Sequence, residues 1–166
     1  MRTDSHCFTG EVLIFPIFVF GGQISAQKLS LEEKINKADM IVVGRVRSVQ
    51  SSWQKAESGK RIVTLVRLSV SAYAKGSAGK EIEIIVPGGS VDGLQQVNSG
   101  LPEFSEGEEV VLFLEGRPLQ LMGSGEGKYS IKNGIVLGLE IPIEEFIGQV
   151  KKTALSDLTN KRNGSK

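Results

Sequence analysis

The sequence predicts a mainly β protein, a small barrel of five or six strands with a short helix before it and an amphipathic helix after it. Several short segments alternate apolar and polar residues with the period of two that a half-buried strand requires. Glycine is abundant, with 20 residues in a chain of 166, as many tight turns between short strands demand. The segments with helical features lie at the two ends of the domain. This order of elements is typical of a small barrel of the OB type.

The first expected strand covers residues 39–53, which are apolar on both faces at first and more polar later. We therefore expect this strand to be buried at its start and exposed toward its end. Gly44 in its middle indicates a bend or a closely approaching neighbour strand. A polar hairpin over residues 54–60 leads into the longest strand, over residues 61–74, with residues 62, 64, 66, 68, 70 and 72 on its apolar face.

A third strand is expected over residues 81–86 and a fourth over residues 109–115, the most strand-like run in the chain. Between them, residues 87–102 are rich in Pro, Gly and Asn, which favour turns. A loop of this length is unusual in a compact domain, and ordered loops of this kind tend to carry function. The remaining expected strands are residues 119–122 and 129–137, the latter as a hairpin about Asn133-Gly134.

The two helices are predicted from capping and periodicity. Ser30 with Glu33 three residues later forms a capping box, so a helix should begin there and run to about residue 37. Pro142 should open the second helix, because its fixed φ suits the first helical position. One apolar stripe follows, made of Ile143, Phe146, Ile147, Val150 and Ala154. We place a single domain at residues 27–159 and a polar tail at residues 160–166.

Residues 12–20 form an uninterrupted apolar run near the amino end. Such a run has the length of a signal-peptide core and about half that of a membrane span. We expect residues 1–26 to be a signal peptide cleaved after Ala26, which leaves an exported, periplasmic or extracellular protein without a membrane span. A retained anchor and a buried first strand are the alternatives, because the one fixed positive charge before the run, Arg2, is offset by Asp4.

Composition narrows the classes of function. The net charge is +1, from 20 Lys and Arg against 19 Asp and Glu, so no field of the whole protein attracts nucleic acid or an anionic membrane. His6 and Cys7 are the only His and Cys in the chain, and both precede the expected cleavage site. The mature chain would lack a thiol, a disulfide, a Ser-His-Asp arrangement and a Cys/His zinc site. We therefore expect a protein that is not an enzyme and holds no cofactor.

Two glycine-rich motifs fail as catalytic or phosphate sites. Residues 123–129 depart from the phosphate-binding loop, because Met122 and Tyr129 stand where that loop needs Gly and Ser or Thr. Ser90, within residues 88–93, misses the nucleophile elbow by one position and has no His partner. The central acids lack the spacing of a calcium loop, so solvated turn residues are the simpler interpretation of Asp92, Glu103, Glu106, Glu108 and Glu109.

A basic face is the basis of an alternative function. Four strand arginines lie near two aromatic residues in the sequence, a combination that single-stranded nucleic acid binders use. Exposed strand arginines of no special function give the same pattern. The residues are Arg45, Arg47, Arg61 and Arg67, with Trp53 and Tyr73. The alternative is therefore a single-stranded nucleic-acid-binding OB domain.

Several short motifs occur in a characteristic order. They are Ala38-Asp39-Met40-Ile41-Val42-Val43-Gly44-Arg45-Val46, Ala74-Lys75-Gly76, Pro87-Gly88-Gly89, Pro102-Glu103-Phe104 with Glu106-Gly107-Glu108 and Val111-Leu112-Phe113-Leu114, and Gly127-Lys128-Tyr129. This ordered set resembles a family of uncharacterised bacterial exported OB-like domains. More distantly it is similar to the netrin-like module of tissue inhibitors of metalloproteinases, an OB barrel. Those inhibitors place an amino-terminal cysteine on a catalytic zinc, and the expected mature chain has no cysteine. The resemblance therefore implies their fold and not their mechanism.

The glycine-rich loop over residues 87–102 is the candidate binding site. Without His or Cys it is expected to bind an unknown protein or cell-envelope partner rather than to catalyse a reaction. The alternative is that the loop only closes the barrel. The candidate partner-binding residues are Gly88, Gly89, Ser90, Asp92, Gln95, Gln96 and Asn98.

Overall fold

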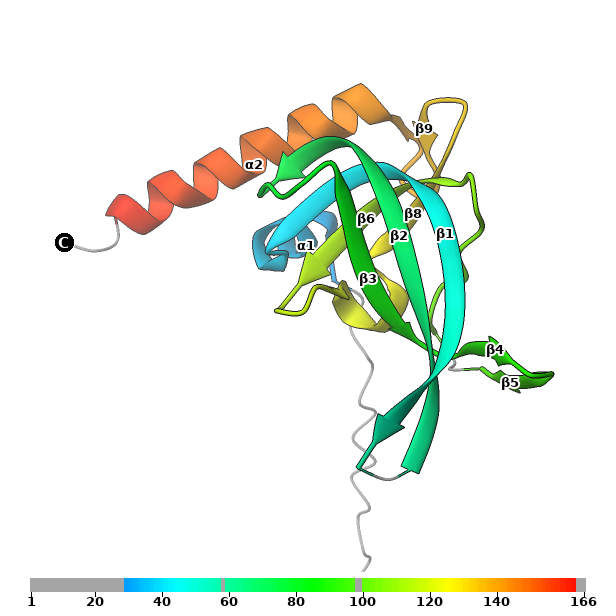
Figure 1. The fold of residues 1–166 in the computed structure, drawn as a ribbon. Coiled ribbons are helices and arrows are strands. Elements are labelled where there is room, and N and C mark those ends of the chain that lie inside the picture. Colours follow the sequence, from blue (N-terminus) through cyan, green and yellow to red (C-terminus); the bar gives the residue numbers. More distant parts are fainter. Residues whose placement is uncertain (1–28, 58, 98–99, 164–166) are drawn as a thin grey trace, which may run out of the picture.

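The computed structural model describes residues 29–57, 59–97 and 100–163, and the expected signal peptide lies outside this part of the chain. The fold is mainly β, with an antiparallel sheet and a helix at each end of the described chain (Figure 1). The predicted mainly β class with two flanking helices is confirmed, whereas the main sheet of the described residues has eight strands instead of the expected five or six. The described chain runs through α1 (Leu31–Lys37), β1 (Met40–Ala56), β2 (Gly59–Lys75), β3 (Glu81–Pro87), β4 (Gly89–Val91), β5 (Leu94–Gln96), β6 (Glu109–Glu115), β7 (Gln120–Leu121), the short 3-10 helix η1 (Met122–Gly125), β8 (Lys128–Lys132), β9 (Ile135–Val136), β10 (Ile141–Pro142) and α2 (Ile143–Asn163).

The main sheet has the strand order β10-β9-β8-β6-β1-β2-β3, and β7 also pairs with β6. The sheet is strongly curved, and the far end of the long β1–β2 hairpin extends beyond the other strands (Figure 1). Among the described residues, the hydrogen-bonded order ends at β3. β4 and β5 form a separate two-stranded sheet that projects from the body of the molecule (Figure 1).

Apolar side chains pack on both faces of the sheet, which explains the continuous apolar run of β6. Val110, Leu112 and Leu114 point to one face, and Val111 and Phe113 point to the other. The first face carries a core enclosed by strands, made of Met40, Val42, Val46, Val66, Leu68, Ile82, Ile84, Val86, Val110, Leu112, Leu114 and Leu121. The second face carries a core covered by both helices, made of Ile35, Ala38, Ile41, Val43, Ala74, Val111, Phe113, Met122, Val136, Phe146 and Val150. We call these the enclosed core and the helical core.

Gly44 marks a point where β1 and β2 approach closely, as the sequence predicts. A Cβ at this position would lie 2.6 Å from the carbonyl oxygen of Ser69. The register shifts beside Gly44, so Ser71 has no partner across the ladder. This extra residue reverses the faces of β2: Val70 packs against the enclosed core and Ala72 against the helical core. Placing both residues on one face was therefore wrong.

Both helices begin close to the predicted residues. In α1, the Glu33 N–H donates to Ser30 Oγ over 3.2 Å and the Ser30 N–H donates to Glu33 Oε2 over 2.8 Å, so the capping box is confirmed. In α2, Phe146 and Val150 are fully buried in the helical core. Among the described helices, none combines the length and hydropathy that crossing a bilayer needs.

Several predicted boundaries differ from the structure. Strand β1 continues to Ala56 and β2 already begins at Gly59, so most of the polar hairpin expected over residues 54–60 is strand. Pro142 pairs with Ile135 in β10, and α2 starts at the next residue. The segment 87–102, expected to be one loop, contains the β4–β5 hairpin. The hairpin expected about Asn133-Gly134 is confirmed, with positive φ at both residues.

Candidate binding site beside the β4–β5 hairpin

The chain leaves β3 through two glycines whose conformations require glycine. Gly88 and Gly89 have φ angles of 98° and 127°, a region that other residues rarely adopt. The Gly88 N–H donates to the Ile62 carbonyl over 2.8 Å. A Cβ on Gly89 would lie 2.3 Å from both Ser51 Oγ and Thr64 Oγ1. The start of β4 therefore passes directly over the hydroxyls of β1 and β2.

Side chains complete the backbone hydrogen bonds where β3 ends. The Thr64 hydroxyl donates to the Gly88 carbonyl over 2.7 Å and lies 2.9 Å from Ser51 Oγ. Gln96, at the end of β5, accepts a hydrogen bond at Oε1 from the Ile62 N–H over 2.9 Å. These contacts fix both ends of the β4–β5 hairpin on β2. They also give the Gly88 carbonyl and the Ile62 N–H the partners that buried backbone groups need.

The hairpin turns at Asp92 and Gly93, which have φ angles of 52° and 77°. Positive φ at both central residues is the signature of a two-residue type I′ turn. The hairpin projects away from the main sheet (Figure 1). Leu94 is 60% exposed on it, and Val97 just beyond β5 is 74% exposed. Two apolar side chains thus extend into solvent from an anchored hairpin.

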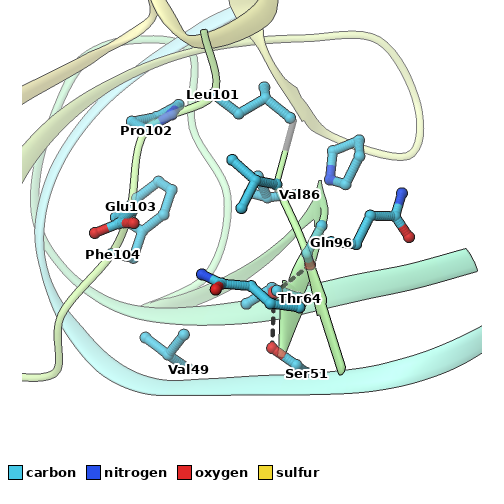
Figure 2. A pocket seen from close by; sticks show the side chains of 14 residues that line it. Val49, Ser51, Thr64, Val86, Gln96, Leu101, Pro102, Glu103 and Phe104 are labelled. Atoms are coloured by element: carbon cyan, nitrogen blue, oxygen red, sulfur yellow. Dashed lines mark hydrogen bonds between the residues drawn. The ribbon is translucent and has the colours of Figure 1, made fainter. Parts of the chain in front are cut away.

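A cavity of about 250 Å³ lies between the base of this hairpin and the segment over residues 101–104. Ser51 and Thr64 stand on one side of it and Leu101, Pro102 and Phe104 stand opposite (Figure 2). Its remaining lining comes from Val49, Val86, Pro87, Gly88, Gly89, Gln95, Gln96, Val97 and Glu103. Val49, Leu101 and Phe104 also pack against the enclosed core, so the cavity lies at one end of that core.

Four of the seven predicted site residues line the cavity, two do not, and one lies outside the described residues. Gly88, Gly89, Gln95 and Gln96 are at its wall. Ser90 is exposed on β4, and Asp92 occupies the exposed hairpin turn. Asn98 lies outside the described residues. The predicted stretch is therefore partly cavity wall and partly projecting hairpin. Gly89 allows the close approach to Ser51 and Thr64, and Gly88 supplies a positive φ.

Sequence reasoning missed the residues that other segments bring to the cavity. Ser51 and Thr64 face each other across the β1–β2 ladder, and Leu101 and Phe104 approach from the opposite side. The available signal was Thr64, a hydroxyl on the otherwise apolar face of its strand. That signal points to a buried hydrogen bond, and it does not identify the partner.

Lys128 holds the segment over residues 101–104, which forms one wall of the cavity, in place. Its Nζ donates to the Glu103 carbonyl over 2.6 Å and to Glu108 Oε2 over 2.8 Å, and it lies 4.8 Å from the centroid of the Phe104 ring. Ser130 Oγ donates to Glu108 Oε1 over 2.6 Å. Lys128 and Glu108 are largely buried, with side-chain exposures of 9% and 21%. Breaking this ion pair should therefore destabilise the protein more than breaking a solvated one.

Replacing Glu108 with glutamine is expected to lower the free energy of unfolding near neutral pH by about 1–2 kcal/mol. Burial by itself raises the pKa of Glu108, but hydrogen bonds from Lys128 and Ser130, the Lys128 charge and the Ser105 N–H outweigh burial, so the pKa lies below its ordinary value of 4.5. A lowered carboxyl pKa stabilises the fold above the unfolded-state pKa, and this stabilisation is lost as the pH falls through the folded-state pKa.

Urea unfolding at about pH 7 and about pH 3 measures this difference between the Glu108→Gln variant and the unmodified protein. We expect the two proteins to converge in acid. Glu115→Gln, at an exposed position at the end of β6, is the control and should change little. A gap between Glu108→Gln and the unmodified protein that stays constant with pH contradicts the assigned role of the carboxylate.

The other central acids do not converge on a common point. Within the described chain, no group of three His, Cys, Asp or Glu side chains is arranged to hold a metal ion. Glu109 pairs with Arg45, and Glu106 Oε1 accepts from the Val49 N–H over 3.4 Å. The interpretation of all five acids as solvated turn residues was wrong for Glu108, because Lys128 and Ser130 enclose it.

The predicted arginines are largely paired with side chains of their own sheet. Arg45 forms an ion pair with Glu109, and Arg67 forms one with Glu83. Arg61 donates to Gln54 Oε1 from Nε and Nη2 over 3.0 and 2.7 Å. Two of the four arginines therefore have adjacent carboxylates, which reduces the positive potential available to a nucleic acid.

Comparison with models of known protein families finds no match to this sequence, and comparison with curated proteins finds none either.

Proposed function

We propose that this protein is an exported, non-catalytic domain that binds a protein partner of the cell envelope through the β4–β5 hairpin and the adjoining cavity. The observation that carries this proposal is the exposure of Leu94 and Val97, 60% and 74%, on an anchored hairpin. Val97 also lines the cavity, and exposed apolar side chains near a cavity are typical of interaction sites. A preformed hairpin also costs little conformational entropy when it binds.

We also propose that the sheet forms a small barrel of the OB type. A curved antiparallel sheet with enclosed apolar side chains supports a barrel of OB type. The ordered motifs support membership of the exported OB-like family, with the distant similarity to the netrin-like module. Cleavage of residues 1–26 stays a prediction. The charge neutralisation of Arg45 and Arg67 favours a protein partner over the single-stranded nucleic acid of the alternative.

Replacing Leu94 and Val97 together with serine is expected to weaken partner binding about tenfold or more, because buried apolar anchors dominate interface energy. The protein immobilised on a support is used to capture species from a cell-envelope extract, and each captured species is quantified by mass spectrometry. A species enriched on the unmodified protein should be depleted on the double variant. Its affinity is then measured with the purified partner.

Leu137→Ser provides the matched control, because Leu137 is 40% exposed next to β9, away from the hairpin. It removes an exposed leucine of similar character and should leave capture unchanged. Equal capture by the hairpin variant and the control would show that the hairpin is not the binding surface. Capture of nothing specific by the unmodified protein would count against a binding function altogether.

A further inference from the structure

The two hydroxyls at the cavity have a fixed order of donor and acceptor. The Thr64 O–H donates to the Gly88 carbonyl over 2.7 Å, and a carbonyl oxygen can only accept. Thr64 has no second hydrogen, so the Ser51 O–H must be the donor in the 2.9 Å contact between the two hydroxyls. The lone pairs of Ser51 Oγ therefore remain available as acceptors at the cavity wall.

Gln96 supplies the complementary donor. Its Oε1 is occupied by the Ile62 N–H, so its Nε2 retains both hydrogens. In the part of the chain that the structure describes, no hydrogen bond uses them. The wall around these polar atoms is mainly apolar, with Val49, Val86 and Leu101. The cavity thus offers an acceptor and a donor within a hydrophobic surround.

This composition matches a carboxamide better than a charged group or a sugar. A carboxylate would be repelled by Glu103, which lines the cavity and is exposed at its rim. An ammonium ion would leave the Gln96 amide hydrogens without an acceptor. A sugar would bury several hydroxyls against apolar walls without partners, which is costly. The volume of about 250 Å³ is below the ~300–1,000 Å³ of drug-sized ligand pockets, so it suits one side chain.

We propose that the cavity is a recognition subsite for one glutamine or asparagine side chain of the partner polypeptide. The carboxamide NH₂ donates to Ser51 Oγ, its carbonyl accepts from Gln96 Nε2, and its aliphatic stem contacts Val49 and Leu101. This inference rests on the proposed function, because the β4–β5 hairpin has to hold the partner next to the cavity. It gives the binding surface a sequence preference.

The test uses the ¹⁵N-labelled protein and three small probes, followed by NMR chemical-shift titration. The probes are N-acetyl-glutamine methylamide, N-acetyl-glutamate methylamide and N-acetyl-leucine methylamide. We expect the glutamine probe to shift the backbone amides of Ser51, Thr64 and Gln96. Its affinity should be about tenfold higher than that of the glutamate probe, whose side chain keeps only one of the two hydrogen bonds, and at least about tenfold higher than that of the leucine probe, whose side chain keeps neither. Equal shifts from the leucine probe, or no saturable shifts, overturn the subsite.

Two variants probe the assigned donor and acceptor. Ser51→Ala removes the acceptor and should weaken binding of the glutamine probe about tenfold. Ser52→Ala is the matched control, because Ser52 is exposed on the opposite face of β1. Gln96→Glu keeps an oxygen for the Ile62 N–H while it removes the amide hydrogens, and it should also weaken binding of the glutamine probe. If Ser51→Ala unfolds, the three-probe comparison on the unmodified protein still decides.

The two levels of the proposal fail in different ways. Partner capture that depends on Leu94 and Val97, combined with equal affinity for all three probes, overturns the carboxamide subsite alone. Discrimination among the probes without any specific capture overturns the proposed partner-binding function and leaves a selective cavity.

Discussion

Replacing Phe113 with alanine is expected to lower the free energy of unfolding by about 3–5 kcal/mol. Phe113 is fully buried in β6. Its ring centroid lies 6.0 Å from that of Phe146 in α2 and 5.7 Å from that of Tyr129 in β8. Removing the ring leaves a cavity in the helical core and removes the edge-to-face ring contact between β6 and α2. Urea unfolding followed by circular dichroism measures the loss.

Phe113→Leu separates the ring from the apolar volume. Leucine retains most of the packing and should cost about 1–2 kcal/mol. Ile85→Ala is the control at an apolar strand position that is 37% exposed, and it should cost less than the alanine substitution at Phe113. If Phe113→Ala costs no more than Ile85→Ala, α2 does not pack on β6 as the structure has it.

The parts of the fold that local chemistry determines follow from the sequence. The capping box at Ser30 and Glu33 sets the start of α1 by reciprocal hydrogen bonds between near neighbours. The hairpin at Asn133-Gly134 follows from the low cost of positive φ at these two residues. The apolar run of β6 predicts a strand, and burial on both of its faces explains why the run does not alternate.

The β4–β5 hairpin escaped prediction although its turn signal was present. Asp92-Gly93 is a favoured type I′ pair, but each flanking strand is three residues long. Leu94 and Val97 are exposed rather than paired with an apolar face. Periodicity detects strands that bury one face, so it gives no signal for strands held by backbone pairing and by one Gln96 hydrogen bond.

The cavity was unpredictable for a different reason, because its parts are brought together by tertiary structure. Ser51 and Thr64 meet through the register of β1 and β2, and Gly89 reaches them only because β3 ends where it does. The face of Ala72 was mispredicted for the same reason, since the unpaired Ser71 changes the alternation. Neither the register nor the bulge is encoded in the residues of one strand alone.

Replacing Gly89 with alanine is expected to lower the free energy of unfolding by about 2–5 kcal/mol and to abolish binding of the glutamine probe. The φ of 127° disfavours any side chain. The new Cβ would also lie 2.3 Å from Ser51 Oγ and from Thr64 Oγ1, so β4 has to move away from β1 and β2. Urea unfolding and the NMR titration measure the two effects.

Gly59→Ala separates backbone strain from this close contact. Gly59 has a nearly equal φ of 123°, but a Cβ at this position would meet no atom within 4 Å, so alanine there costs strain alone, about 1–3 kcal/mol. The excess cost at Gly89 therefore reports how tightly β4 lies on the two hydroxyls. In a Ser51→Gly background, the cost of Gly89→Ala should fall by about 0.5–1.5 kcal/mol, because one of the two clashes is gone. Equal costs at Gly89 and Gly59, with no coupling to Ser51, would mean that the hairpin is not seated on these hydroxyls and that the cavity wall is not preformed.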